Sequence, residues 1–113
     1  MASDTNPRMW HVTLTVAGEP RDAAEVRAAL ERLAHDHPFL LSGRYAADRA
    51  EVSYWEQAPD LYDAAALALR LWGEHRTTAG LPSWEIVGLE VIDRGTYQLR
   101  TLPPASPGVV RPF

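Results

Sequence analysis

The sequence of 113 residues contains no cysteine. Disulfides, thiolate nucleophiles and cysteine-ligated zinc are therefore excluded, so a metal site would need histidine and carboxylate ligands. The chain also lacks a basic segment, because no run of Lys or Arg exceeds two residues and the net charge is −4. Proteins that bind nucleic acid or anionic lipid normally present a basic face, so we expect neither as a partner.

Long apolar runs are absent as well. No window approaches the roughly 18 apolar residues of a membrane span, and the first eight residues lack the apolar centre of a signal peptide. These absences predict a cytoplasmic protein. The length suits one domain with one hydrophobic core, which we expect at residues 9–100. It would follow a flexible segment at 1–8 and precede an extended tail at 101–113 that contains four prolines.

The most regular pattern lies at residues 9–17, where apolar and polar side chains alternate. A period of two predicts a strand with one buried face and one more polar face. The apolar set is Trp10, Val12, Leu14 and Val16, and the polar set is His11, Thr13 and Thr15.

Further along the chain, capping residues and breakers delimit the other elements. Asp22 and Asp60 are typical of helix N-caps, and Gly80 is typical of a C-cap. The apolar spacing predicts helices at 22–35 and 61–77, and strands at 39–46, 50–56 and 84–93. The second helix has an unusually wide apolar arc that includes Leu61. We therefore expect it to contact more than the sheet: the first helix, the tail or a partner subunit.

This order, β-α-β-β-α-β, resembles the ferredoxin-like superfold across residues 9–100. The chain is also similar to small uncharacterised proteins of high-GC bacteria, which supply no activity to carry over. The resemblance implies an α+β two-layer sandwich with an antiparallel or mixed four-stranded sheet and both helices on one face. It further implies that the first and third strands are parallel neighbours at the centre, and that the other face is open.

The open face is the strongest candidate for a functional surface, because it mixes large apolar groups with evenly spaced polar ones. It either forms a small-molecule pocket, with His11 and Glu51 as the titratable pair, or makes a homodimer contact, for which the sheet edge is the alternative. We expect Ile86 and Ile92 on this face. The candidate ligand-binding residues are His11, Thr13, Thr15, Tyr45, Glu51, Ser53, Trp55 and Glu90.

Two other segments invite a functional interpretation. In His35-Asp36-His37 the two histidines are two positions apart, so on a helix they point about 200° away from each other and cannot chelate one ion. A histidine near a helix C-terminus is favoured by the dipole alone, so we expect no metal. The turn containing Gly18 and Arg21 precedes a helix N-terminus, where anions bind.

The sequence therefore predicts a homodimeric, non-enzymatic binding module that uses the open face of its sheet and carries no cofactor. One alternative is a dimeric α+β-barrel enzyme of the monooxygenase-like type, with His11, Tyr45, Glu51 and Trp55 lining its cavity. Another is a regulator resembling ACT domains that binds a small molecule at the Gly18 turn. No catalytic residue is assigned, because a shared fold does not fix function.

Overall fold

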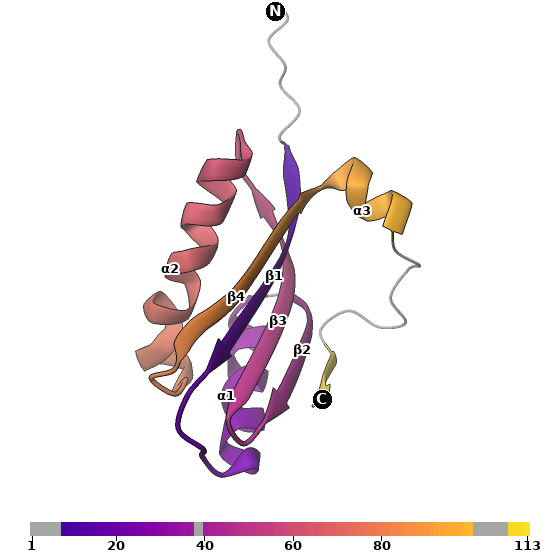
Figure 1. Ribbon diagram of the computed structural model, residues 1–113. Helices are drawn as coiled ribbons and strands as arrows, with labels where there is room; N and C mark the ends of the chain where they lie inside the picture. Colours follow the sequence, from indigo (N-terminus) through magenta and orange to yellow (C-terminus); the bar gives the residue numbers. More distant parts are fainter. Residues whose placement is uncertain (1–7, 38–39, 101–108) are drawn as a thin grey trace, which may run out of the picture.

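The computed structural model describes residues 8–37, 40–100 and 109–113. The expectations for residues 1–7, Pro38, Phe39 and 101–108 lie outside this part of the chain. Eight elements follow one another along the sequence (Figure 1): β1 (Met9–Ala17), α1 (Ala23–Asp36), β2 (Leu40–Ala46), β3 (Arg49–Gln57), α2 (Leu61–Ala79), β4 (Glu85–Asp93), α3 (Arg94–Arg100) and β5 (Val109–Pro112).

The domain is of the α+β class, and its strands form one mixed sheet in the order β4-β1-β3-β2-β5. The six elements predicted between residues 9 and 93 all occur, in the predicted order and with boundaries close to those expected. The sheet has five described strands rather than four. Its first four are joined antiparallel, and β5 pairs parallel with β2.

The expected parallel pairing of β1 with β3 is wrong. Helix α1 returns the chain so that β2 runs in the same direction as β1, and the tight turn at Ala47 and Asp48 then reverses β3. β3 consequently lies antiparallel to β1 along its whole length, from Met9 opposite Gln57 to Ala17 opposite Arg49.

The helix ends form where the capping residues predict them. The Asp22 carboxylate accepts a hydrogen bond from the Ala24 amide at 3.0 Å, and the Asp60 carboxylate accepts one from the Asp63 amide at 2.9 Å. Gly80 ends α2 in the left-handed conformation, with φ of 71°, which a residue with a side chain rarely adopts.

One face of the sheet carries the hydrophobic core. Val12, Leu14 and Val16 of β1 are at most 1% exposed, and they pack with the buried sides of α1 and α2. In Figure 1, α2 lies along the β4 side of the sheet and α1 lies behind its lower half. Within α2 the burial runs through Ala64, Ala68, Leu71 and Trp72, whereas Leu61, expected on the same side, is 42% exposed.

Two elements were not predicted. The short helix α3 follows β4 directly, and β5 extends the sheet beyond β2. The tail was expected to be extended without belonging to the sheet, but its described end forms a strand. Val110 of β5 is paired with Gly43 and packs against the core, which explains why this segment keeps its place.

Irregularities in β4 overturn one of the open-face assignments. Val16 is paired with Ile86, but Thr15 is paired with Gly88, so Val87 is an extra residue in the strand. Such a β-bulge reverses the alternation of the faces. Ile86 therefore packs against the core on the helical side instead of lying on the open face, and the extra residue, Val87, is 55% exposed.

Tyr45 is also on the other face from the one expected. The two-residue turn sets Tyr45 directly opposite Ala50, and directly opposed residues point to the same side of a sheet. Ala50 is fully buried beneath the helices, so Tyr45 packs against the core as well.

The loop between β1 and α1 is fixed by a tryptophan. The Trp84 indole nitrogen donates a hydrogen bond to the Glu19 carbonyl at 2.9 Å, and the indole ring covers Gly18. A Cβ added to Gly18 would collide with the Trp84 ring carbon Cδ1. Glycine is therefore needed here for close approach rather than for an unusual backbone angle.

We predict that Gly18→Ala lowers the free energy of unfolding by about 1–3 kcal/mol, the usual effect of overpacking. Urea denaturation monitored by circular dichroism measures it. Gly95→Ala is the matched control, because the nearest atom to its added Cβ lies 3.9 Å away. Equal stability of Gly18→Ala and the native protein would contradict the assigned role of the indole.

Candidate functional site

The face of the sheet away from α1 and α2 presents cross-strand rows of side chains. One row runs from Glu90 through Thr13 and Ser53 to Ser42, and the next runs through Thr15, Glu51 and Arg44 to Arg111. A third row contains Ile92, His11 and Trp55. Seven of the eight candidate residues thus share this face, and only Tyr45 does not.

Helix α3 lies over one end of this face and brings Tyr97 onto the third row. The Tyr97 ring is 4.3 Å from the His11 ring and 4.9 Å from the Trp55 ring, centroid to centroid. His11 and Trp55 are themselves in edge-to-face contact at 5.4 Å. We call these three rings the aromatic cluster. They are drawn from β1, β3 and α3, elements that are far apart in the sequence.

Polar side chains make contacts at both ends of α3. At its start, the Asp93 carboxylate accepts a hydrogen bond from the Thr96 amide at 2.8 Å. Hydrogen bonds from Thr96, first from its side chain and then from its amide, lower the pKa of Asp93, so the cap stays ionised. At its end, Arg100 and Glu90 form an exposed ion pair at 3.4 Å, which contributes little because water screens it.

A cavity of about 380 Å³ lies beside the aromatic cluster. Its lining combines apolar and aromatic surface with a guanidinium and an amide, and is made of Met9, Trp55, Arg94, Tyr97 and Gln98. Ligand cavities in proteins commonly fall between about 300 and 1,000 Å³, with mostly apolar walls and a few polar groups. A second hollow of about 210 Å³, next to Asp93, shares Met9 and Arg94 with it.

Burial dominates the electrostatics of His11. It lowers the pKa of His11 below its ordinary value, and the nearby Glu90 carboxylate raises the pKa by a smaller amount. At neutral pH the imidazole is therefore uncharged, with one ring nitrogen as a donor and the other as an acceptor. The aromatic cluster thus contains a neutral imidazole in contact with both of the other rings.

The polar candidates lie next to one another but do not form a catalytic arrangement. The hydroxyls of Thr13 and Ser53 are 3.5 Å apart at the centre of the face. Glu51 lies two rows away from His11 along β1, with the Thr13 row between them. The expected titratable pair of His11 and Glu51 is therefore not brought together, and Glu90 is the carboxylate that acts on His11.

Four of the five cavity residues were missed: three lie in residues 94–100, to which no element was assigned, and the fourth is Met9 at the start of the predicted first strand. A weak signal was present. Asp93 precedes Thr96 by three positions, which is the spacing of an N-cap, and Tyr97 is the one aromatic residue in a polar stretch. Because Asp93 was assigned to the end of the predicted last strand, its role as the N-cap of a following helix was overlooked.

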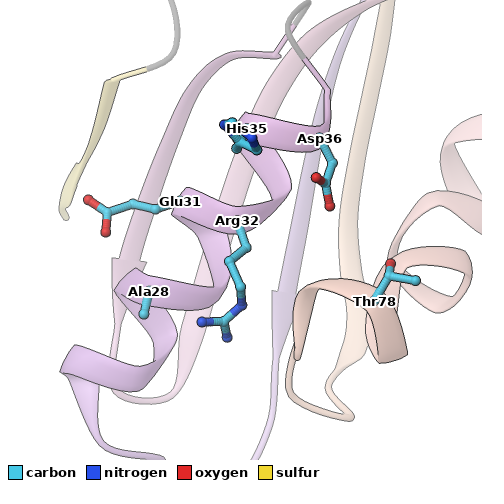
Figure 2. A pocket seen from close by; sticks show the side chains of 6 residues that line it. All are labelled: Ala28, Glu31, Arg32, His35, Asp36 and Thr78. Carbon is cyan, nitrogen blue, oxygen red and sulfur yellow. The ribbon is translucent and has the colours of Figure 1, made fainter.

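A separate cavity of about 500 Å³ lies between α1 and α2. Figure 2 shows Arg32 reaching from α1 toward α2, between the acidic side chains Glu31 and Asp36. The Arg32 Nε donates a hydrogen bond to the Ala79 carbonyl at 2.7 Å, so the guanidinium caps the C-terminal end of α2. The charged residues that line this cavity therefore have a structural role in capping α2 or belong to the exposed surface, and we assign no ligand to it.

The His35-Asp36-His37 segment is not organised as a chelate. His37 is the C-cap of α1, and its Nε2 lies 3.3 Å from Nδ1 of His75 on α2. Burial and the neighbouring His75 lower the pKa of His37, and the Asp36 carboxylate raises it. Within the described ranges, no group of three or more His, Asp or Glu residues is arranged to hold a metal ion.

The β1–α1 turn is closed on the protein rather than open to an anion. The Gly18 amide donates to the Asp48 carbonyl at 3.0 Å, and the Arg21 amide donates to the Ala47 carbonyl at 2.8 Å. Two of the groups that could bind a phosphate or an amino acid are therefore occupied. The expectation of ligand binding at Gly18 gains no support from this geometry.

These features define a small α+β domain with an aromatic-walled cavity at one end of its open sheet face. The chain belongs to the family described as a domain of unknown function, DUF8830, which matches residues 9–107. No curated protein matches the sequence. In the part of the chain that the structure describes, no helix is both long and apolar enough to cross a membrane.

The half-buried imidazole of His11 predicts a pH-dependent contribution to stability. The pKa of His11 is lower in the folded than in the unfolded protein, so its contribution is complete above about pH 6.5. It is lost as the pH falls from that value toward the folded pKa. We expect His11→Phe, which keeps a ring in place but cannot titrate, to lose less thermal stability than the native protein between pH 7 and pH 5. Equal losses of melting temperature between pH 7 and pH 5 in the native protein and in His11→Phe would contradict this prediction.

Proposed function

We propose that the protein is a non-enzymatic binding module whose site is the aromatic cluster and the adjoining cavity. The observation that carries this proposal is Tyr97, which α3 places 4.3 Å from the His11 ring and 4.9 Å from the Trp55 ring. Beside these contacts lies a cavity of about 380 Å³ with an aromatic wall on β3 and another on α3. No nucleophile with an adjacent base is part of the arrangement, so binding is favoured over catalysis.

The chemistry of the walls indicates the class of ligand. Trp55 and Tyr97 offer ring faces and edges, Met9 offers a polarisable thioether, and Arg94 and Gln98 offer donors at the rim. Flat rings stack on aromatic side chains, and a guanidinium binds a carboxylate in a bidentate manner. The ligand is therefore a small planar ring compound that carries a carboxylate.

We further propose that the domain is a ferredoxin-like unit and that it works as a dimer. The strand order β4-β1-β3-β2 and the two helices packed on one side support a ferredoxin-like unit to which α3 and β5 are added. The protein acts as a homodimer in the cytoplasm. A monooxygenase-like barrel would require the open faces of two copies to pack against each other. In each copy α3 already lies over one end of that face, which disfavours the barrel.

The ligand class is tested by thermal shift with paired probes, benzoate and indole-3-acetate against their neutral amides. We expect the acids to raise the melting temperature of the native protein. Trp55→Ala and His11→Ala should abolish this rise while leaving the folded spectrum unchanged, because Trp55 forms a wall and His11 positions Tyr97. Arg94→Gln should remove the preference for acids over amides.

Phe113→Ala is the matched control, because Phe113 is a half-exposed aromatic residue on the far edge of the sheet, beyond β2. It should respond to the probes as the native protein does. An acid response that survives in Trp55→Ala, or one that disappears equally in Phe113→Ala, would show that the probes bind elsewhere.

A further inference from the structure

The outer face of α2 carries an apolar stripe that the described fold leaves uncovered. Its members are spaced by four, three and four residues, which places them in one line along a helix: Tyr62, Ala66, Leu69 and Gly73. Tyr62 is 82% exposed and Leu69 is 49% exposed. An apolar stripe at this spacing is typical of a helix that packs against another helix.

Building on the homodimer of the proposed function, we propose that this stripe is its interface, formed by α2 and the α2 of a second copy packed antiparallel about a two-fold axis. The sizes of the side chains along the stripe fit this arrangement. With the axis between Ala66 and Leu69, each leucine meets the partner's Ala66, and each Tyr62 meets the partner's Gly73. Apart from its chain neighbours and the backbone of α2, nothing in the described chain comes within 4 Å of the position that a Cβ at Gly73 would take, so the helix surface there is open.

The charges beside the stripe fit the same arrangement. Asp63 and Arg70 flank the stripe on the same side, seven residues apart, and both are exposed. In the antiparallel pair, Asp63 of each copy lies beside the partner's Arg70, so the two-fold axis generates two ion pairs. Across the described residues, the intramolecular ion pairs include neither of these side chains.

The polarity of the helix as a whole favours the same arrangement. The first turn of α2 and its cap are acidic, with Asp60 and Asp63, and the last turn contains Arg76. An antiparallel partner brings the acidic start of one helix to the basic end of the other and also opposes the helix dipoles. In Figure 1, α2 lies at the side of the sheet away from α3, so pairing through α2 leaves the aromatic cluster of each copy accessible.

The interface is tested by the mass of the full chain in solution, measured by light scattering and by sedimentation over a micromolar dilution series. We expect a dimer for the native protein and a folded monomer for Leu69→Glu. Leu99→Glu is the matched control, because Leu99 is 90% exposed on α3 and lies outside the stripe, and it should stay dimeric. A monomeric native protein, or a dimeric Leu69→Glu, would overturn the proposal.

Charge exchange tests the antiparallel direction. Asp63→Arg and Arg70→Asp should each raise the dimer dissociation constant by about tenfold, because each replaces two attractive pairs by two repulsive ones. Combining the two substitutions should restore the native constant. Unchanged single variants, or a double variant weaker than either single one, would overturn the arrangement. Ligand binding at the aromatic cluster is measured separately, so the two proposals can fail independently.

Discussion

The strict alternation of β1 is the constraint on which the rest of the structure depends. Val12, Leu14 and Val16 must be buried beneath α1 and α2, and in a strand this forces the intervening side chains to the opposite face. Because β1 is paired on both sides, that opposite face is continuous with β3 and β4. The position of His11 on the open face therefore follows from core formation, before any ligand is considered.

Helix α3 covers one end of this open face. α3 needs little to hold it: the cap at Asp93, the ion pair at Arg100 and the contact of Tyr97 with two rings. A short helix held mainly by one aromatic side chain has few buried contacts and belongs to the least stable part of a domain. The cavity beneath it is thus built from a rigid floor, the sheet, and a more adaptable wall.

Strong local patterns made much of the fold predictable. The period of two at β1, the caps at Asp22 and Asp60 and the glycine at the end of α2 each depend on residues close in sequence. The failures are of another kind. The bulge at Val87 and the register of Tyr45 are set by pairing with other strands. A prediction that assumed unbroken alternation along each strand therefore placed Ile86 and Tyr45 on the wrong face. The aromatic cluster was predicted only in part. His11 and Trp55 were found because they lie in strands with a clear period of two, whereas Tyr97 lies in a helix too short to show a period.

The central claim is that Tyr97 stacks on the open face of the sheet and forms the wall of a ligand cavity. Nuclear Overhauser effects from the Tyr97 ring test it most directly, in the unliganded protein at neutral pH. The structure predicts cross-peaks to the ring protons of both His11 and Trp55, at centroid distances of 4.3 and 4.9 Å. Their absence, in a sample where the buried Tyr54 ring still shows its core contacts, would contradict the account.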